Sequence, residues 1–133
     1  MARGLEKHKQ REAALSLYGK DLARRSGRKC ELCSSSGVAL TIYELQPVPE
    51  EPVFENCIFI CHDCCDQLVK PKTLQAEKWR GLKETIWSEE RVVQVMAGRV
   101  LSYLSKDHAW AQEILEEAYL DEDVEEWMKR QLL

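Results

Sequence analysis

Two pairs of cysteines are the residues of this chain whose spacing most clearly indicates a chemical role. The stretches C-E-L-C at 30–33 and C-H-D-C at 61–64 each hold two cysteines three positions apart, and 27 residues separate them. A C-x-x-C turn folds into a tight knuckle that presents two sulfurs to one ion, and a structural zinc site takes four tetrahedral ligands. The pattern therefore predicts one Zn²⁺ ion bound by Cys30, Cys33, Cys61 and Cys64.

This ligand set favours a structural zinc over a catalytic one. A catalytic zinc keeps one coordination position open for water and usually carries histidine or carboxylate ligands. Four thiolates leave no open position and give the site a net charge of about −2, which weakens the ion as a Lewis acid. We therefore assign no catalytic residue, and no cofactor besides the zinc ion.

Two further cysteines and one histidine lie close to the second pair along the chain. Cys65 directly follows a ligand, and a residue in that position ordinarily points away from the ion. Cys57 falls in a predicted strand whose period of two places it on the face opposite Ile58 and Ile60. His62 could replace a cysteine as a ligand, but a histidine inside a knuckle is more often exposed. We predict that Cys57 and Cys65 are small buried or half-buried thiols.

A redox role for the paired cysteines is the main alternative to a metal site. Such a role needs a cysteine at a helix N-terminus within a βαβ unit, and no βαβ pattern flanks Cys30. The charged N-terminus shows no secretory signal, and no apolar run approaches the roughly 18 residues of a membrane helix. We therefore expect a cytoplasmic protein without a membrane segment, in a compartment where paired cysteines are more often metal ligands than disulfides.

Charge is distributed unevenly along the chain. Residues 1–29 carry nine Lys or Arg against three carboxylates, although the net charge of the whole 133-residue chain is −4. A basic segment of this kind could follow a phosphate backbone by releasing counterions, but an amphipathic helix with a solvated basic face gives the same count. If the partner is a nucleic acid, the candidate contacts are Arg3, Lys7, Lys9, Arg11, Arg24, Arg25, Arg28 and Lys29.

A predicted β-hairpin brings the two cysteine pairs together. Residues 38–45 and 54–60 have the alternation and β-branched content of strands. The stretch between them, QPVPEEP, must be a loop because proline cannot donate a hydrogen bond to a ladder. A helix with Leu15, Tyr18 and Leu22 at helical spacing precedes the first knuckle, and a glycine at position 27 is expected to end it.

After the second cysteine pair the periodicity is helical. A short helix ends before Pro71, and another surrounds residues 74–82. A third has a broad apolar face between Val92 and Leu104, with Ser88 as its N-cap, and Asp107 is expected to cap a fourth. The acidic start and basic end of the final stretch suit one more helix. The tryptophans among aliphatic neighbours on these helices are predicted to pack in the core: Trp79, Trp87, Trp110 and Trp127.

These elements predict an α+β fold. A zinc-stabilised β-hairpin, of the treble-clef or zinc-ribbon kind, is followed by a small bundle of about four α-helices. We predict a basic N-terminal helix at 1–28 and a zinc module at 29–70. A helical region at 71–133 is expected to pack on that module, so that the whole forms one compact domain.

A knuckle, a hairpin and a second knuckle that opens a helix resemble the treble clef of HNH nucleases. Those enzymes tend to carry paired histidines before a proline, and the corresponding stretch here is IYELQP, with Tyr43 and Glu44 in their place. The histidines of this chain are His8, His62 and His108, none of them in the required position. The resemblance therefore implies a related scaffold that lacks the catalytic residues.

The chain more closely resembles the PhnA family, whose name refers to an alkylphosphonate utilisation operon. The similar stretches lie between Arg25 and Trp127: RSGRKCELC, LTIYELQPVP, FICHDCCDQL, KWRGLKETIWSEERVVQVMAGRVLSYL and AYLDEDVEEW. The resemblance implies a zinc-ribbon region with helices, in which the two C-x-x-C pairs bind zinc. Cys57 and Cys65 depart from the family pattern, and the small β-barrel that usually follows in that family has no counterpart in this sequence.

We therefore expect a non-enzymatic, zinc-stabilised module that binds a protein or a nucleic acid. The alternative is an enzyme, either a divergent HNH-like nuclease or a hydrolase linked to phosphonate metabolism. Nothing in the sequence supplies the carboxylate and histidine ligands of a hydrolytic two-metal site. Because treble clefs host many unrelated roles, the function has to be inferred from the site.

Overall fold

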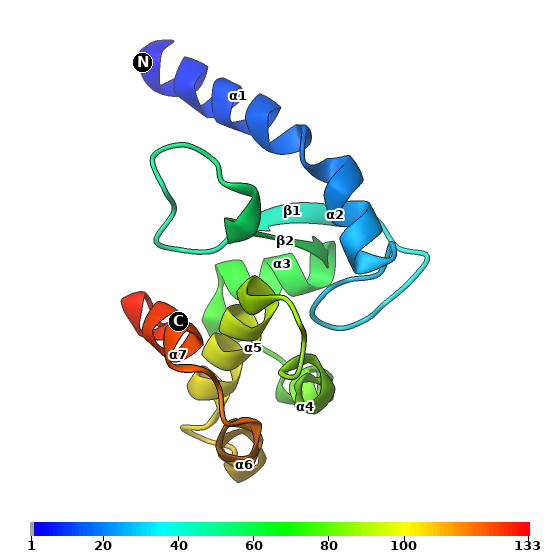
Figure 1. Cartoon of the computed structure of the whole chain (residues 1–133), viewed down its shortest axis with the longest axis vertical. Helices are drawn as coiled ribbons and strands as arrows, with labels where there is room; N and C mark the ends of the chain where they lie inside the picture. The colour runs from blue at the N-terminus through cyan, green and yellow to red at the C-terminus, as the bar shows by residue number, and fades with distance from the viewer. Residues whose placement is uncertain (1) are drawn as a thin grey trace.

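The polypeptide folds into a two-stranded antiparallel sheet that lies between two groups of helices (Figure 1). The structure is a computed structural model that describes residues 2–133, with side chains from residue 4 onward. The α+β class agrees with the sequence. The elements are α1 (Ala2–Ser16), α2 (Gly19–Ser26), β1 (Leu40–Glu44), β2 (Cys57–Cys61), α3 (His62–Val69), α4 (Leu82–Thr85), α5 (Arg91–Leu104), α6 (Ala109–Ala118) and α7 (Glu122–Arg130), with 3₁₀ turns at Phe54–Asn56, Pro71–Thr73 and Ala76–Gly81. Within residues 2–133, no helix is long and apolar enough to cross a membrane.

The two faces of the β-hairpin pack against different helices. Its strands pair from Leu40 opposite Cys61 to Glu44 opposite Cys57, so side chains alternate between the faces. Ile58 and Ile60 are fully buried in the main core, on the side of α3 and α5. Cys57 is buried on the opposite face, where α2 contacts β2. The period-two prediction for the second strand is therefore confirmed, although both strands are shorter than predicted.

The N-terminal segment forms two helices where the sequence predicts one. At the junction the backbone N–H groups of Leu17 and Tyr18 bond to carbonyls only three residues back, which turns the chain between α1 and α2. As a result α2 lies against the hairpin, while the first part of α1 extends beyond it (Figure 1). The end of α2 is as predicted: Gly27 has a φ of 64°, the left-handed conformation of a glycine helix stop.

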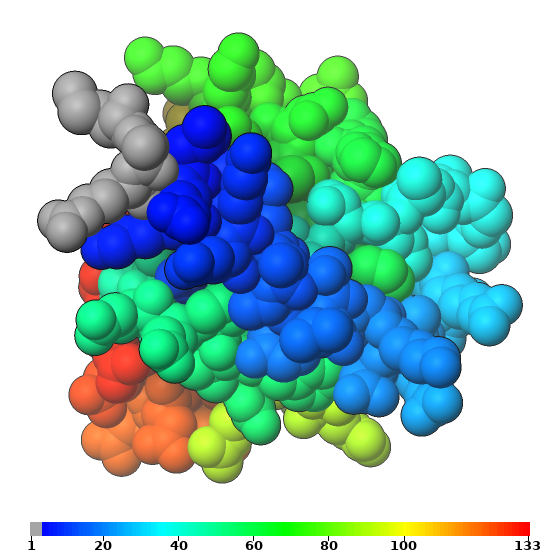
Figure 2. Space-filling model, turned by 90° about the horizontal axis from the view of Figure 1, so that it is seen from above, coloured from blue at the N-terminus to red at the C-terminus, as the bar shows by residue number. Residues whose placement is uncertain are grey.

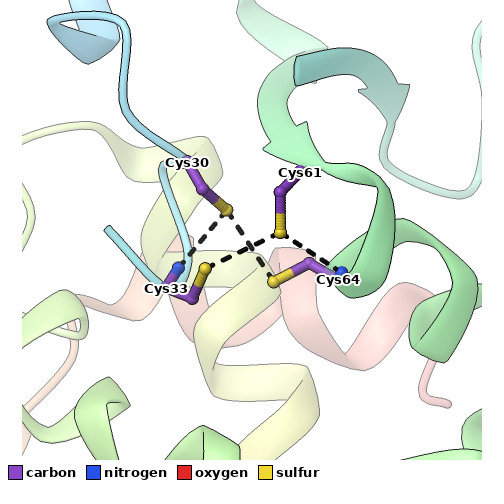
Figure 3. Close-up of side chains that lie close together, drawn as sticks. All are labelled: Cys30, Cys33, Cys61 and Cys64. Carbon is purple, nitrogen blue, oxygen red and sulfur yellow. Dashed lines mark hydrogen bonds between the residues drawn. The ribbon is translucent and has the colours of Figure 1, made fainter. Parts of the chain in front are cut away.

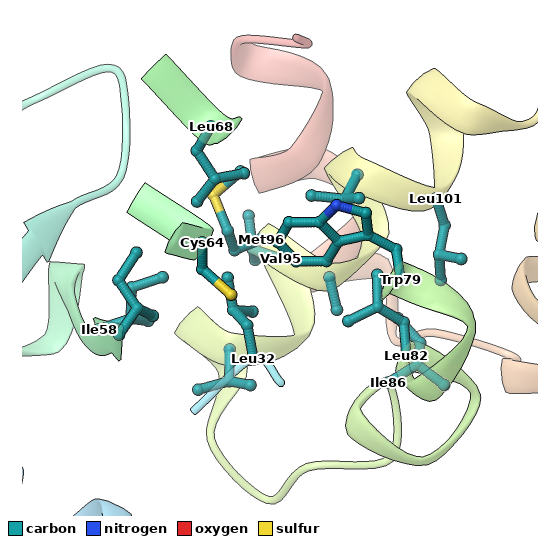
Figure 4. Close-up of a cluster of buried hydrophobic side chains, with 14 of the residues drawn as sticks. Leu32, Ile58, Cys64, Leu68, Trp79, Leu82, Ile86, Val95, Met96 and Leu101 are labelled. Carbon is teal, nitrogen blue, oxygen red and sulfur yellow. The ribbon is translucent and has the colours of Figure 1, made fainter. Parts of the chain in front are cut away.

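The later helices α4, α6 and α7 pack against α5. The buried apolar residues of α5 include every one that the sequence predicts for its inner face: Val92, Val93, Met96, Val100, Leu101 and Leu104. Trp79 is the largest fully buried side chain, and Figure 4 shows it among residues from α3, α4 and α5. Its indole N–H donates to the Gln67 side-chain oxygen at 2.8 Å. The core is therefore built on α5, with Trp79 at its centre.

Helix starts differ from the prediction by one or two residues. The N-cap of α5 is Glu90, and the predicted cap, Ser88, instead accepts a hydrogen bond from the Glu90 N–H. The N-cap of α6 is His108 in place of Asp107. A serine or aspartate near a helix start can satisfy a backbone donor from several positions, so composition locates such a start only approximately.

The region around the first two tryptophans also differs from the prediction. The helix expected at residues 74–82 is a 3₁₀ turn followed by the short α4. Trp87 follows α4 at a turn and is 61% exposed, so the prediction that it packs in the core is wrong. Trp110 and Trp127 are half-buried against the core, as expected of large aromatic side chains.

Candidate metal centre

Four cysteine sulfurs converge between the first knuckle and the start of α3 (Figure 3). The Sγ atoms of Cys30, Cys33, Cys61 and Cys64 all lie within 4.8 Å of one another. The Cys30–Cys64 and Cys33–Cys61 distances are both 3.7 Å. Four sulfurs at about 2.3 Å from one zinc ion would be roughly 3.8 Å apart in a regular tetrahedron. The four cysteines therefore lie close enough together to hold one metal ion.

Backbone hydrogen bonds shape both knuckles. In the first, the Cys33 N–H donates to the Cys30 Sγ at 3.4 Å. In the second, Cys61 ends β2 and is the N-cap of α3, and its Sγ accepts from the Cys64 N–H at 3.5 Å. A hydrogen bond to a sulfur favours the charged thiolate over the neutral thiol. Each turn thus supports the form of cysteine that binds a metal.

The pKa values within the cluster show why a cation would stabilise it. The hydrogen bond with Cys64 lowers the pKa of Cys30, and the same contact together with burial raises the pKa of Cys64. Burial also raises the pKa of Cys61. Four sulfurs this close and this buried cannot all carry a negative charge unless a positive charge lies among them. A soft dication such as Zn²⁺ matches thiolate ligands and supplies that charge.

Glu31, inside the first knuckle, connects that knuckle to β2 and α2. Its N–H donates to the Phe59 carbonyl at 2.9 Å, and its Oε1 accepts from the Phe59 N–H at 2.8 Å. Arg25 of α2 binds the same carboxylate through two nitrogens, at 3.0 and 2.7 Å, and donates to the Cys57 carbonyl at 2.9 Å. The side chains of Arg25 and Glu31 are only 13% and 5% exposed. This buried ion pair positions the first knuckle against the strand that ends in the second.

Lys78 places a positive charge near the sulfur cluster. Its Nζ is 2.6 Å from the Oδ2 of Asp63, which lies inside the second knuckle. Burial by itself would lower the pKa of Lys78, but Asp63 and the nearby ligand sulfurs outweigh burial and raise it. An ammonium group at this position offsets part of the negative charge of a four-thiolate site.

The remaining cysteines and His62 lie outside the cluster. Cys57 is fully buried, its Sγ donates to the Val53 carbonyl at 3.4 Å, and burial raises its pKa to about 11. Cys65 is half-buried beside the main core, and burial raises its pKa too. His62 is exposed. Thiols with raised pKa values stay neutral, so both cysteines pack as small apolar side chains, in agreement with the sequence prediction.

Tyr43 and Glu44 stand where the HNH resemblance expects histidines, and they point to opposite faces of the hairpin. Glu44 accepts two hydrogen bonds from Arg11 of α1, at 2.8 and 2.6 Å. Tyr43 lines a pocket beside Arg99 of α5. Within the described part of the chain, the four clustered cysteines are the one group of three or more His, Cys, Asp or Glu residues that could hold a metal.

Two of the basic residues suggested as nucleic-acid contacts form largely buried ion pairs inside the molecule. Arg11 donates to Glu44 and to the carbonyls of Pro49 and Glu50, which joins α1 to the loop between the strands. Arg25 is bound to Glu31. The exposed members of the set are Lys7, Lys9, Arg24, Arg28 and Lys29. Figure 2 shows the N-terminal part of the chain spread across one face of the molecule, and the side chain of Arg3 lies outside the described residues.

Sequence reasoning missed the charged side chains that support the ligands. Arg25 and Glu31 lie six residues apart, on either side of a helix end, so no helical spacing connects them. Lys78 lies in a 3₁₀ turn that reaches the second knuckle only in the folded chain. The sequence offered one signal for these contacts, which is that Glu31 lies between two predicted ligands. A carboxylate in that position does not show which cation it will pair with.

Comparison with known proteins does not place this chain in a family. No family model, curated protein or solved structure matches it. The resemblance to the PhnA family therefore remains an expectation from its motifs, and the function is inferred from the geometry of the site.

Proposed function

We propose that this chain is a structural-zinc module of the PhnA type, with the ligand arrangement of a treble clef and no catalytic activity. The observation that carries the proposal is the convergence of four cysteines from two knuckles, three of them buried. Four thiolates would complete the coordination sphere of one zinc ion and leave no position for water or substrate. The ion would join the loop after α2 to the end of β2 and the start of α3, and its binding energy would stabilise the fold.

The surroundings of β1 give less support to an enzyme of the nuclease or phosphonate-hydrolase kind than to a structural module. Metal-assisted hydrolysis needs an open coordination position or a second ion. Glu44, the carboxylate in the relevant stretch, is already bound by Arg11. Burial raises the pKa of Tyr43, so its hydroxyl is protonated at neutral pH and is a weak general base.

Metal analysis and Co²⁺ substitution test the zinc proposal. We expect native mass spectrometry to show one zinc ion per chain, and the Co²⁺-loaded protein to show strong sulfur-to-metal absorption that azide does not change. A second bound ion, or a Co²⁺ spectrum that azide alters, would contradict a closed site. Cleavage of DNA or release of phosphate from a phosphonate by metal-defined protein, lost in Glu44→Gln or Tyr43→Phe, would establish an enzyme instead.

We further propose that the partner is a nucleic acid, which binds through the basic N-terminal segment. Most side chains of α1 are exposed, apart from those such as Arg11 and Leu15 that meet the hairpin. Exposed cations along α1, α2 and the following turn suit a phosphate backbone because their contacts release counterions. The eight carboxylates between Glu113 and Glu126 would repel a polyanion and direct it to the basic segment.

A salt titration with two matched variants tests this partner. One variant changes five exposed basic residues of the segment to Gln: Lys7, Lys9, Arg24, Arg28 and Lys29. The control changes five exposed basic residues elsewhere to Gln: Lys70, Lys72, Lys83, Lys129 and Arg130. For duplex DNA we expect the magnitude of the slope of log K against log salt to fall by up to about 4.5 in the first variant and to change little in the second. No detectable affinity at low salt, or an equal loss in both variants, would reject the nucleic acid and leave a protein partner.

A further inference from the structure

A pocket beside α5 contains a buried arginine that the metal site does not use. The pocket has a volume of about 330 Å³ and is lined by residues of β1, α3, α5 and the segment after α7. Arg99 of α5 lines it and is only 2% exposed. Removing a guanidinium from water is costly unless an anion or a full set of hydrogen bonds compensates. The partners of Arg99 therefore indicate what the pocket can bind.

Arg99 has hydrogen-bond acceptors but no anionic partner in the described chain. Its Nε donates to the Met128 carbonyl at 3.3 Å, and its Nη2 donates to the Trp127 carbonyl at 2.8 Å. These carbonyls belong to the last turn of α7, where the helix dipole favours a cation but supplies only partial charge. No carboxylate of residues 4–133 forms an ion pair with Arg99, and Nη1 has no acceptor among those residues. The guanidinium thus retains charge and a donor for a ligand.

Two other polar side chains line the same pocket. The Tyr43 hydroxyl forms no hydrogen bond with the described residues. Burial raises the pKa of Tyr43, and the Arg99 guanidinium is close enough to oppose part of that rise. Gln46 uses its carbonyl oxygen to accept from the Gln131 amide at 2.8 Å, so its own amide N–H groups remain free to donate. A hydroxyl, an amide and a guanidinium are therefore available as donors in one pocket.

The remaining wall of the pocket is aliphatic. Leu68 and Val69 of α3 and Met96 of α5 line it, together with Pro71, Leu132 and Leu133. A volume near 330 Å³ is at the small end of the range for ligand pockets, which starts at about 300 Å³. Inorganic phosphate would satisfy the donors but leave the aliphatic wall without a partner. The pocket suits a ligand with an anionic group at one end and a short apolar body at the other.

We propose that this pocket binds a small organic carboxylate, whose anionic group pairs with Arg99 and whose aliphatic chain packs against Leu68, Val69 and Met96. A planar carboxylate matches the geometry of a guanidinium, and a charge-assisted hydrogen bond is stronger than a neutral one. A free short-chain acid and the C-terminal carboxylate of a peptide present this same chemistry. The proposal is independent of the metal and of the nucleic-acid partner.

NMR titration of the metal-loaded protein tests the ligand class. The probes are sodium butyrate, 1-butanol and inorganic phosphate at constant ionic strength, with N-acetylvaline and its carboxamide as the peptide-end pair. We expect butyrate to shift the Arg99 Nε–H and the Tyr43 and Leu68 signals saturably, with an affinity about 10-fold to 100-fold above that for 1-butanol or phosphate. Tighter binding of N-acetylvaline than of butyrate would identify the C-terminal end of a peptide as the natural ligand. Tighter binding of butyrate would identify a free short-chain acid. Equal affinity for butyrate and 1-butanol, or no saturable shift at these residues, would overturn the proposal.

Variants separate binding from folding. Leu132→Glu introduces a carboxylate at a pocket residue that is 56% exposed, so it can occupy the place of the ligand without removing core packing. Leu17→Glu makes the same change at an 80% exposed site on the N-terminal segment. We expect butyrate binding to be lost in Leu132→Glu and in Arg99→Met, and kept in Leu17→Glu. If Arg99→Met does not fold, the comparison of the two glutamate variants decides: unchanged binding in Leu132→Glu would reject the pocket.

Discussion

At the scale of single residues, the last cysteine of the second knuckle and the cysteine that follows it differ in the direction of their side chains. The Sγ of Cys64 lies in the cluster, whereas Cys65 packs beside the core. We predict that Cys64→Ala weakens zinc binding by more than about 100-fold, because even supporting side chains contribute 10-fold to 100-fold. Cys65→Ala should keep one zinc ion per chain. Competition with a chromophoric chelator measures both affinities, and an equal loss in the two variants would contradict the ligand assignment.

Two adjacent arginines of α2 test the buried ion pair beside the first knuckle. Arg25 and Glu31 are largely buried, so Arg25→Met leaves a buried carboxylate without its cation and should lower the free energy of unfolding by about 3–5 kcal/mol. Arg24 lies 3.9 Å from Asp21, and both side chains are mostly exposed. Arg24→Met should change that free energy by no more than about 0.5 kcal/mol. Urea denaturation of the two variants provides the comparison, and similar effects would show that the Arg25 pair is not structural.

At the scale of elements, two glycines that end or begin helices have opposite backbone requirements. Gly27 ends α2 with a φ of 64°, a conformation that costs a residue with a Cβ roughly 1–2 kcal/mol. Gly81 has a φ of −64°, and a Cβ there would meet nothing within 4 Å. We predict that Gly27→Ala lowers the melting temperature, whereas Gly81→Ala leaves it unchanged or raises it by reducing the entropy of the unfolded chain. Calorimetry distinguishes these outcomes, and a loss at Gly81 with none at Gly27 would be inconsistent with the helix ends described.

A third glycine, Gly98 of α5, lies against the Met128 side chain of α7. A Cβ added to Gly98 would lie 2.5 Å from the Met128 Sδ and 2.7 Å from its Cε. The Sδ and Cε atoms are the flexible end of the Met128 side chain and can move aside, so Gly98→Val should overpack this contact at the lower end of the usual cost, about 1 kcal/mol. Combining it with Met128→Ala should cost less than the sum of the two single changes, since the shorter side chain makes room. A double-mutant cycle in urea measures this coupling, and strict additivity would mean that the two helices do not meet as described.

At the scale of the whole molecule, one buried cluster includes both the cysteine site and the helices. Cys30, Leu32 and Cys64 belong to the same core as Val95 of α5 and Val124 of α7. We predict that the zinc module and the helical region unfold together, so that removal of the metal by a chelator also abolishes the tertiary packing of the helices.

This prediction is checked with two signals in one thermal or urea experiment. The Co²⁺–thiolate absorption reports on the metal site, and the near-UV circular dichroism of the tryptophans, Trp79 above all, reports on the helical core. Coincident midpoints are expected for one cooperative domain. Helices that keep their near-UV signal after complete chelation would show two independent units and contradict the single compact domain.

The sequence by itself determined the features that depend on residues close together along the chain. The spacing of the two C-x-x-C turns identified the four candidate ligands because a knuckle is a local backbone structure. The period of two in the second strand put Ile58 and Ile60 on the face opposite Cys57, and the period of 3.6 identified the inner face of α5. Gly27 ended α2 as predicted, since only the local backbone conformation is involved.

Only the tertiary structure decided which distant side chains meet. It paired Arg25 with Glu31 and Arg11 with Glu44, and it left Trp87 in solvent although Ile86 beside it is buried. It also placed Arg99 in a pocket formed by four separate parts of the chain. The physical reason is that burial and charge pairing depend on how whole elements pack, whereas periodicity and spacing report only on the element to which a residue belongs.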